Sequence, residues 1–152
     1  MASVIPTFNE SIGKINTILE AIDLLQSKLE EIFPNKKMIT TICDGIYTHE
    51  GYEVNHVIFA IYIISSMYEK NTILFKNDIN EFEVKLLVIT SILLGIKICE
   101  DAPWTNKYWA RKFGYELKIL NNAEFIILKE YEIDFSPSIE RIWEVVNRKI
   151  EN

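Results

Sequence analysis

The feature that most constrains the fold of this chain is a nearly apolar run from Val84 to Ile98, in which Lys85 and Lys97 are the only charged residues. The run is too short to cross a bilayer, because a transmembrane helix needs roughly 20 predominantly apolar residues. A helix that is apolar on most of its sides must therefore be covered by other parts of the protein. We expect a central helix from Asp78 to Cys99, with Asp78 or Asn80 as its N-terminal cap.

Apolar residues at alternating spacings of three and four predict helices along most of the chain, and no alternating pattern typical of strands competes with them. Thr7 and Glu10 resemble a capping box, so the first helix is expected to begin there and to end at Phe33-Pro34. Gly114 is a natural stop for a short later helix. Further helices are expected at residues 35–47, 52–68, 105–114, 117–131 and 138–150. The predicted fold class is therefore all-α.

The length and composition fit one compact domain. With 152 residues, the chain can bury about 70% of the surface that its unfolded form exposes. Its net charge of -6 disfavours a surface that follows nucleic-acid phosphates. Cys43 and Cys99 lie in apolar segments of a chain that needs no disulfide, which indicates a reducing compartment. The N-terminus lacks the basic start and apolar core of a signal peptide, so we expect a soluble intracellular protein of the cytoplasm or nucleus, with no nucleic-acid or membrane partner.

Two charged residues occupy positions where a helix should be packing. Lys97 lies at the end of the central helix, and Glu124 lies on the apolar face that Leu120 and Ile127 define in a later helix. A buried carboxylate requires a partner, although a glutamate at the boundary can also reach water. A lysine in a last turn can equally complement the helix dipole while its stem covers apolar surface. We expect the partner of these charges to be another protein and not a substrate.

Metal-ligand residue types recur at one place in the sequence. His49, Glu53 and His56 would align on a continuous helix, but Gly51 interrupts that helix. There is no His-Glu-x-x-His motif and no second ligand cluster that could complete a dinuclear site. We therefore expect a surface pair of histidines and no metal. A glycine-rich phosphate loop and a CxxC motif are also absent, so nothing in the sequence predicts nucleophilic catalysis.

Four aromatic residues fall within ten positions: Trp104, Tyr108, Trp109 and Phe113. Such a cluster is typical of a core or of an interface anchor. Stacking on nucleic-acid bases would need accompanying positive charge, which neighbouring basic residues supply only in part, within an acidic protein. Core or interface anchoring is the interpretation that the composition favours.

The second half of the chain combines features that few protein families share. They are Lys97 followed by Glu100-Asp101, the stretch WTNKYWARKFG from Trp104 to Gly114, the spacing L-x-x-L-x-x-x-E from Leu117 to Glu124, and Leu128 with Ile133 beyond it. With these features, the chain from Ile39 to about Phe135 resembles a cyclin box. It is most similar to the P-type or U-type, phosphate-regulon-like cyclins, which have a single box.

This resemblance implies an architecture. The cyclin box would be a five-helix bundle around a central third helix, spanning residues 35–136. An extra N-terminal helix would occupy residues 1–34, and an extra C-terminal helix would occupy residues 137–152. The periodicity described above independently allows this arrangement.

The resemblance also implies a role, as the regulatory subunit that binds and activates a cyclin-dependent protein kinase. In that family the lysine and the glutamate hydrogen-bond backbone around the kinase C-helix, so Lys97 and Glu124 are the expected kinase-binding residues. Ile98, Leu128 and Ile133 are expected to line the apolar seat beside them. The chain itself would be no enzyme, and it would need no cofactor, no metal and no small-molecule substrate.

Two other functions remain open on the sequence alone. A cyclin-fold scaffold or transcription adaptor would have the same fold but would bind no kinase. A metal-dependent all-α hydrolase would need a stoichiometric metal ion. Recovery of a kinase in a pull-down distinguishes the first alternative, and metal analysis of the purified protein distinguishes the second.

Overall fold

The computed structural model describes residues 15–70, 79–100 and 105–149, and within these ranges all helices are α-helices and no strand is present. The helices are α2 (Ile18–Ile32), α3 (Lys36–Tyr47), α4 (Val54–Lys70), α6 (Glu81–Cys99), α7 (Asn106–Phe113), α8 (Leu117–Glu130) and α9 (Ile139–Asn147). The predicted all-α class is thus confirmed. No helix in the described ranges has the length and apolarity that crossing a membrane requires.

Several helices begin and end where local side-chain chemistry directs them. The side chain of Asn80 accepts a hydrogen bond from the backbone N–H of Glu83, which confirms Asn80 as the cap of α6. Thr105 caps α7 in the same way, through the N–H of Tyr108. Gly114 ends α7 with a φ of 79°, a left-handed conformation that glycine adopts without a steric penalty.

The helix that was predicted from Thr7 to Phe33-Pro34 is not continuous in the part that the structure describes. Thr7 and Glu10 lie outside the described residues, and the chain is not yet helical at Ile15. Helix α2 begins after Thr17, whose side-chain oxygen accepts the backbone N–H of Glu20 at 3.1 Å. The sequence therefore contains two Thr-x-x-Glu pairs, and the second pair caps this helix. The other end of α2 is as expected, at Ile32 before Pro34.

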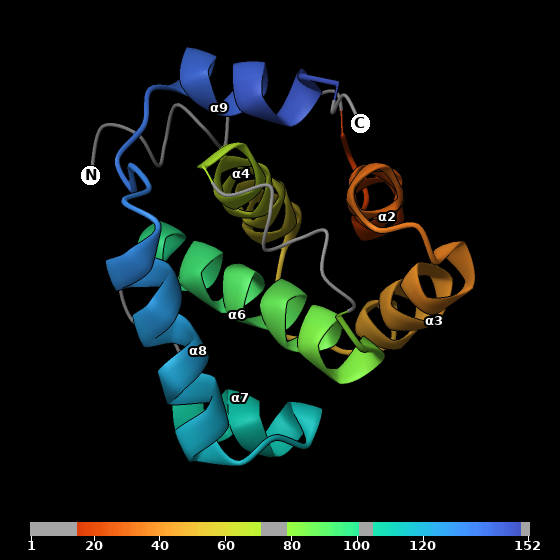
Figure 1. Cartoon of the computed structure of the whole chain (residues 1–152), viewed down its shortest axis with the longest axis vertical. Coiled ribbons are helices and arrows are strands. Elements are labelled where there is room, and N and C mark those ends of the chain that lie inside the picture. The colour runs from red at the N-terminus through yellow and green to blue at the C-terminus, as the bar shows by residue number, and fades with distance from the viewer. Residues whose placement is uncertain (1–14, 71–78, 101–104, 150–152) are drawn as a thin grey trace.

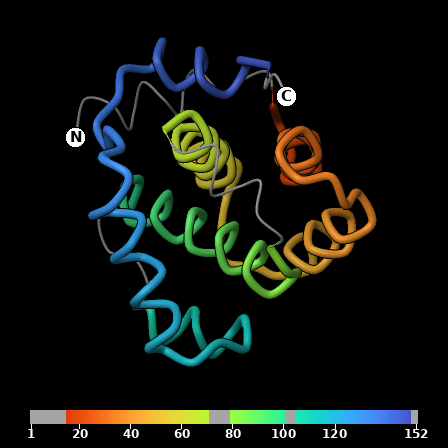
Figure 2. Tube along the Cα trace, in the orientation of Figure 1, coloured from red at the N-terminus to blue at the C-terminus, as the bar shows by residue number. Residues whose placement is uncertain are grey.

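Helices α4 and α6 form the centre of the molecule, because both are buried along most of their lengths. Figure 1 shows α2 and α3 on one side of this pair, α7 and α8 on the other side, and α9 across one end of α4. The Cα trace in Figure 2 shows the same arrangement without the ribbons. The expected burial of the helix at 78–99 is confirmed for the described part of it, and α6 shares its central place with α4.

Close contact between α4 and α6 depends on one glycine. A Cβ atom on Gly95 of α6 would lie 2.7 Å from the carbonyl oxygen of His56 in α4. The polar residues Thr90 and Ser91 are also buried in α6, and each donates its hydroxyl hydrogen to a carbonyl of the preceding turn. The helix can therefore lie in an apolar core without unsatisfied hydroxyl groups.

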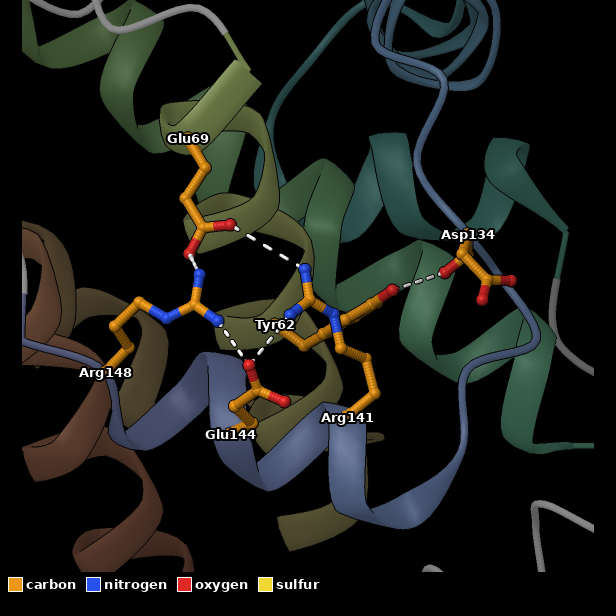
Figure 3. Close-up of polar contacts among 6 residues, drawn as sticks. All are labelled: Tyr62, Glu69, Asp134, Arg141, Glu144 and Arg148. Atoms are coloured by element: carbon orange, nitrogen blue, oxygen red, sulfur yellow. Dashed lines mark hydrogen bonds and ion pairs between the residues drawn. The ribbon is translucent and has the colours of Figure 1, made fainter.

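Helix α9 covers one end of the bundle, and both apolar and polar contacts hold it there. Its buried face consists of Ile142, Val145 and Val146. The segment before it is fixed by Tyr62, whose hydroxyl group donates to the backbone carbonyl of Asp134 at 2.6 Å (Figure 3). The buried ammonium group of Lys28 donates to the carbonyl of Arg148 at 2.6 Å, just beyond the end of α9.

Candidate functional site

The candidate site is built around a direct ion pair between Lys97 and Glu124. The Nζ atom of Lys97, in the last turn of α6, lies 2.9 Å and 2.6 Å from the two carboxylate oxygens of Glu124 in α8. The side chains keep 31% and 17% of their surfaces exposed, so the pair lies at the surface and not in the core. The carboxylate has the partner that its position requires, but that partner belongs to the same chain. The expectation that another protein binds these two charges stays a prediction, because a contact between them leaves other hydrogen-bonding positions on both groups.

A third residue, Asn106, fixes the orientation of the carboxylate. Its side-chain amide at the start of α7 donates to Oε2 of Glu124 at 3.1 Å and to Oδ1 of Asn121 at 2.9 Å. The site thus joins the end of α6, the start of α7 and the middle of α8. The local cause is the cap at Thr105, which begins α7 and places Asn106 in its first turn. Asn106 belongs to the stretch that resembles the family motif, but its contact with Glu124 was not predicted.

Exposed apolar side chains surround the ion pair on α8. Leu117, Asn121, Glu124 and Leu128 follow one another at spacings of four, three and four, so they share one face of the helix. Leu117 is 40% exposed and Leu128 is 47% exposed, and Phe125 beside them is 55% exposed. We call these five residues the α8 strip. A charged pair within an exposed apolar strip is a surface suited to binding another protein.

The structure places the remaining predicted site residues at different depths. Leu128 lies on the α8 strip, and Ile98 is half-buried at the end of α6. Ile133 is only 7% exposed, because the chain turns inward after Glu132, which has a φ of 48°. Ile133 therefore packs in the core and offers little surface to an external apolar partner. Leu117 was not predicted as a site residue, although its spacing of seven from Glu124 was a usable signal.

The predicted surface pair of His49 and His56 is wrong. His56 is 2% exposed, because it lies where α4 contacts α6 most closely, opposite Gly95. His49 packs instead against the ring of Phe113, with the ring centroids 4.4 Å apart. Burial lowers the pKa of both imidazoles below the usual value of 6.5. At neutral pH both rings are therefore uncharged.

Glu53, His56 and Glu100 bring three possible metal-ligand atoms within 4.8 Å of one another. However, Nδ1 of His56 accepts the backbone N–H of Glu53 at 2.8 Å, so the neutral ring carries its hydrogen on Nε2. This hydrogen is donated to Oε1 of Glu100 at 2.9 Å, and a protonated nitrogen has no lone pair for a metal ion. We interpret the group as a structural link between the start of α4 and the end of α6.

The aromatic cluster of α7 is divided between core and surface. Trp109 and Phe113 are buried, as expected for anchoring residues, whereas Tyr108 is 37% exposed. Lys112 lies over the rings of both Tyr108 and Trp109, at 5.7 Å and 5.6 Å from their centroids. Trp104 lies outside the described residues. The cluster therefore fixes α7, and with it Asn106, on the rest of the bundle.

The two cysteines do not provide a nucleophile. Cys43 and Cys99 are both buried and unbridged. Burial raises the pKa of each thiol to about 12, so both are protonated at neutral pH.

Comparisons of the chain with protein-family models, with curated proteins and with solved structures found no match.

Proposed function

We propose that this chain is a cyclin-like regulatory subunit that binds and activates a cyclin-dependent protein kinase. The observation that supports this proposal most directly is the partly exposed ion pair of Lys97 and Glu124, whose carboxylate lies within the α8 strip. An exposed apolar strip with a small number of directed polar groups fits an amphipathic helix of a partner, which is what a kinase C-helix provides.

The ion pair retains hydrogen-bonding capacity for a docked backbone. A carboxylate offers about four lone-pair positions, and Glu124 uses three of them for Lys97 and Asn106. The ammonium group of Lys97 carries three hydrogens, of which two are directed at Glu124. A partner can therefore accept a hydrogen bond from Lys97 and donate one to Glu124 without separating the pair.

The proposed mechanism is a shift between two positions of the kinase C-helix. Docking on the α8 strip stabilises the inward position, in which the kinase completes the lysine–glutamate pair that orients the ATP phosphates. The phosphoryl transfer belongs to the kinase, and the regulatory chain contributes binding energy only. No cofactor, metal ion, nucleic acid or membrane takes part in this proposal.

The decisive measurement is kinase affinity in single variants of the pair. Affinity purification from the native organism first identifies the kinase, and calorimetry then compares Lys97→Ala and Glu124→Ala with the unchanged protein. Each change is expected to weaken binding by about 2–5 kcal/mol, because it leaves a polar group unpaired in the interface.

Two exposed charges away from the strip provide matched controls for this measurement: Lys37→Ala in α3 and Glu81→Ala in α6 are expected to leave affinity unchanged. Circular dichroism checks that all four variants remain folded. Full affinity in both site variants would overturn the assignment of the site. Failure to recover any kinase would favour the scaffold or adaptor function instead.

A further inference from the structure

A cavity of about 280 Å³ lies between three helices, away from the ion pair. Helix α6 contributes Glu83, Leu86 and Leu87, which share one face at spacings of three and one. Helix α8 contributes Ala123, Ile126 and Ile127 in the same pattern, and α4 contributes Met67, which is 4% exposed. The volume lies just below the usual range for small-molecule sites, so the cavity suits only a small ligand.

The chemistry of the lining is apolar with a single charge. Glu83 is the only charged residue among the lining residues, and its carboxylate has no hydrogen-bond or ion-pair partner among the residues that the structure describes. It lies in the first turn of α6, where the positive end of the helix dipole favours a negative charge. A ligand in this cavity therefore meets hydrocarbon along most of its length, the phenol group of Tyr131 and the single anionic group of Glu83.

We propose that this cavity binds a small amphipathic molecule with an apolar body and one cationic group, such as a primary alkylamine. The apolar body displaces water from the faces of α6 and α8, and the ammonium group pairs with Glu83. Charge complementarity selects this class over neutral or anionic molecules of the same length. Ile126, which is 41% exposed, stands at the rim and leaves the cavity open to solvent.

The cavity is separate from the proposed kinase-binding surface, although α8 contributes to both. The lining positions Ala123, Ile126 and Ile127 and the strip positions Leu117 and Leu128 lie on different faces of α8. A ligand in the cavity therefore leaves the α8 strip uncovered. The inference does not depend on whether the partner is a kinase.

Three probes of equal chain length test the proposal: octylamine, 1-octanol and octanoate. Each is titrated into the protein while the methyl signals of Met67 and Ala123 are followed by NMR. Octylamine is expected to bind about fivefold more tightly than octanol, the factor that one exposed ion pair supplies, and octanoate is expected to bind most weakly. Ala123→Leu, which fills the cavity, is expected to abolish binding of all three probes.

Two substitutions in the first turn of α6 distinguish a specific ion pair with Glu83 from a general attraction of the cationic probe to acidic residues. Glu83→Gln is expected to make octylamine and octanol bind equally, whereas Glu81→Gln is expected to preserve the fivefold difference, because Glu81 does not line the cavity. Equal binding of octylamine and octanol by the unchanged protein would overturn the proposal, as would an absence of binding at millimolar concentration. If the protein sediments as a dimer and the probes dissociate that dimer, the cavity is instead a binding site for a second copy of the chain.

Discussion

At the scale of single residues, the imidazole of His56 links two helices through both of its nitrogens. Nδ1 accepts the N–H of Glu53 at the start of α4, and Nε2 donates to Glu100 at the end of α6. Burial lowers the pKa of His56, and the hydrogen bond to Glu100 opposes this effect only in part. Protonation of the ring would direct an Nδ1 hydrogen at the N–H of Glu53, so the charged form loses one of the two bonds.

The free energy of unfolding is therefore expected to decrease as the pH is lowered below about 6.5, the ordinary pKa of histidine. The unfolded chain binds a proton at His56 more readily than the folded chain does, so acid favours unfolding across the window below that value. Urea unfolding at about pH 7.5 and about pH 5.5 measures this loss, and His56→Gln is expected to reduce it.

His49→Gln is the matched control, because the folded state lowers the pKa of His49 as well, but His49 does not contact Glu100. This variant should retain the part of the pH dependence that belongs to His56. An unchanged pH dependence in His56→Gln would show that the buried ring does not carry the effect.

At the scale of elements, the contact between α4 and α6 requires a position without a side chain. Gly95 faces the backbone of His56 so closely that an added Cβ atom would lie 2.7 Å from its carbonyl oxygen. Backbone atoms cannot move aside as a flexible side chain can, so the two helices would have to separate. A Cβ atom added to Gly45 in α3 would meet no atom within 4 Å.

The variants Gly95→Ala and Gly45→Ala are expected to change stability in opposite directions. Gly95→Ala should destabilise the protein by about 1–3 kcal/mol, because it overpacks the central contact. Gly45→Ala should stabilise it by about 0.5–1 kcal/mol, because alanine is the better helix former and meets open space. Chemical unfolding of both variants measures the difference. A gain in stability for Gly95→Ala would contradict the close packing described here.

Much of the helical pattern was predictable because its signals are local. The caps at Asn80 and Thr105 and the stop at Gly114 depend on a few neighbouring residues, and the sequence displays them directly. The cap of α2 was not predicted, because Thr17 and Glu20 lay inside a continuous helical pattern and share the Thr-x-x-Glu spacing with Thr7 and Glu10.

The sequence singled out Lys97 and Glu124, but it predicted neither the geometry of the candidate site nor the place of Leu117 and Asn106 in it. The positions of Lys97 and Glu124 were found from charge on apolar helices, whereas their direct contact depends on how α8 crosses α6. That crossing is a tertiary property, and no short-range pattern encodes it. The burial of Ile133 and His56 was missed for a related reason, because both follow turns whose direction the sequence does not reveal.

At the scale of the whole molecule, helix α9 completes one end of the bundle through two kinds of contact. On its outer side, Arg141 and Arg148 lie between Glu144 of the same helix and Glu69 of α4, as Figure 3 shows. These four side chains are 32–58% exposed, and solvent screens such pairs strongly. On its inner side, Ile142 is fully buried and contributes apolar area to the core.

We therefore expect burial, and not the charge network, to hold α9 in place. Ile142→Ala should lower the free energy of unfolding by about 2–5 kcal/mol, because it leaves a cavity in the core. Arg141→Ala and Arg148→Ala should each cost at most about 1 kcal/mol, and less at high salt. Urea unfolding at low and high ionic strength measures all three variants. If an arginine variant cost as much as Ile142→Ala, the exposed network would be the main contact that fixes the end of the chain.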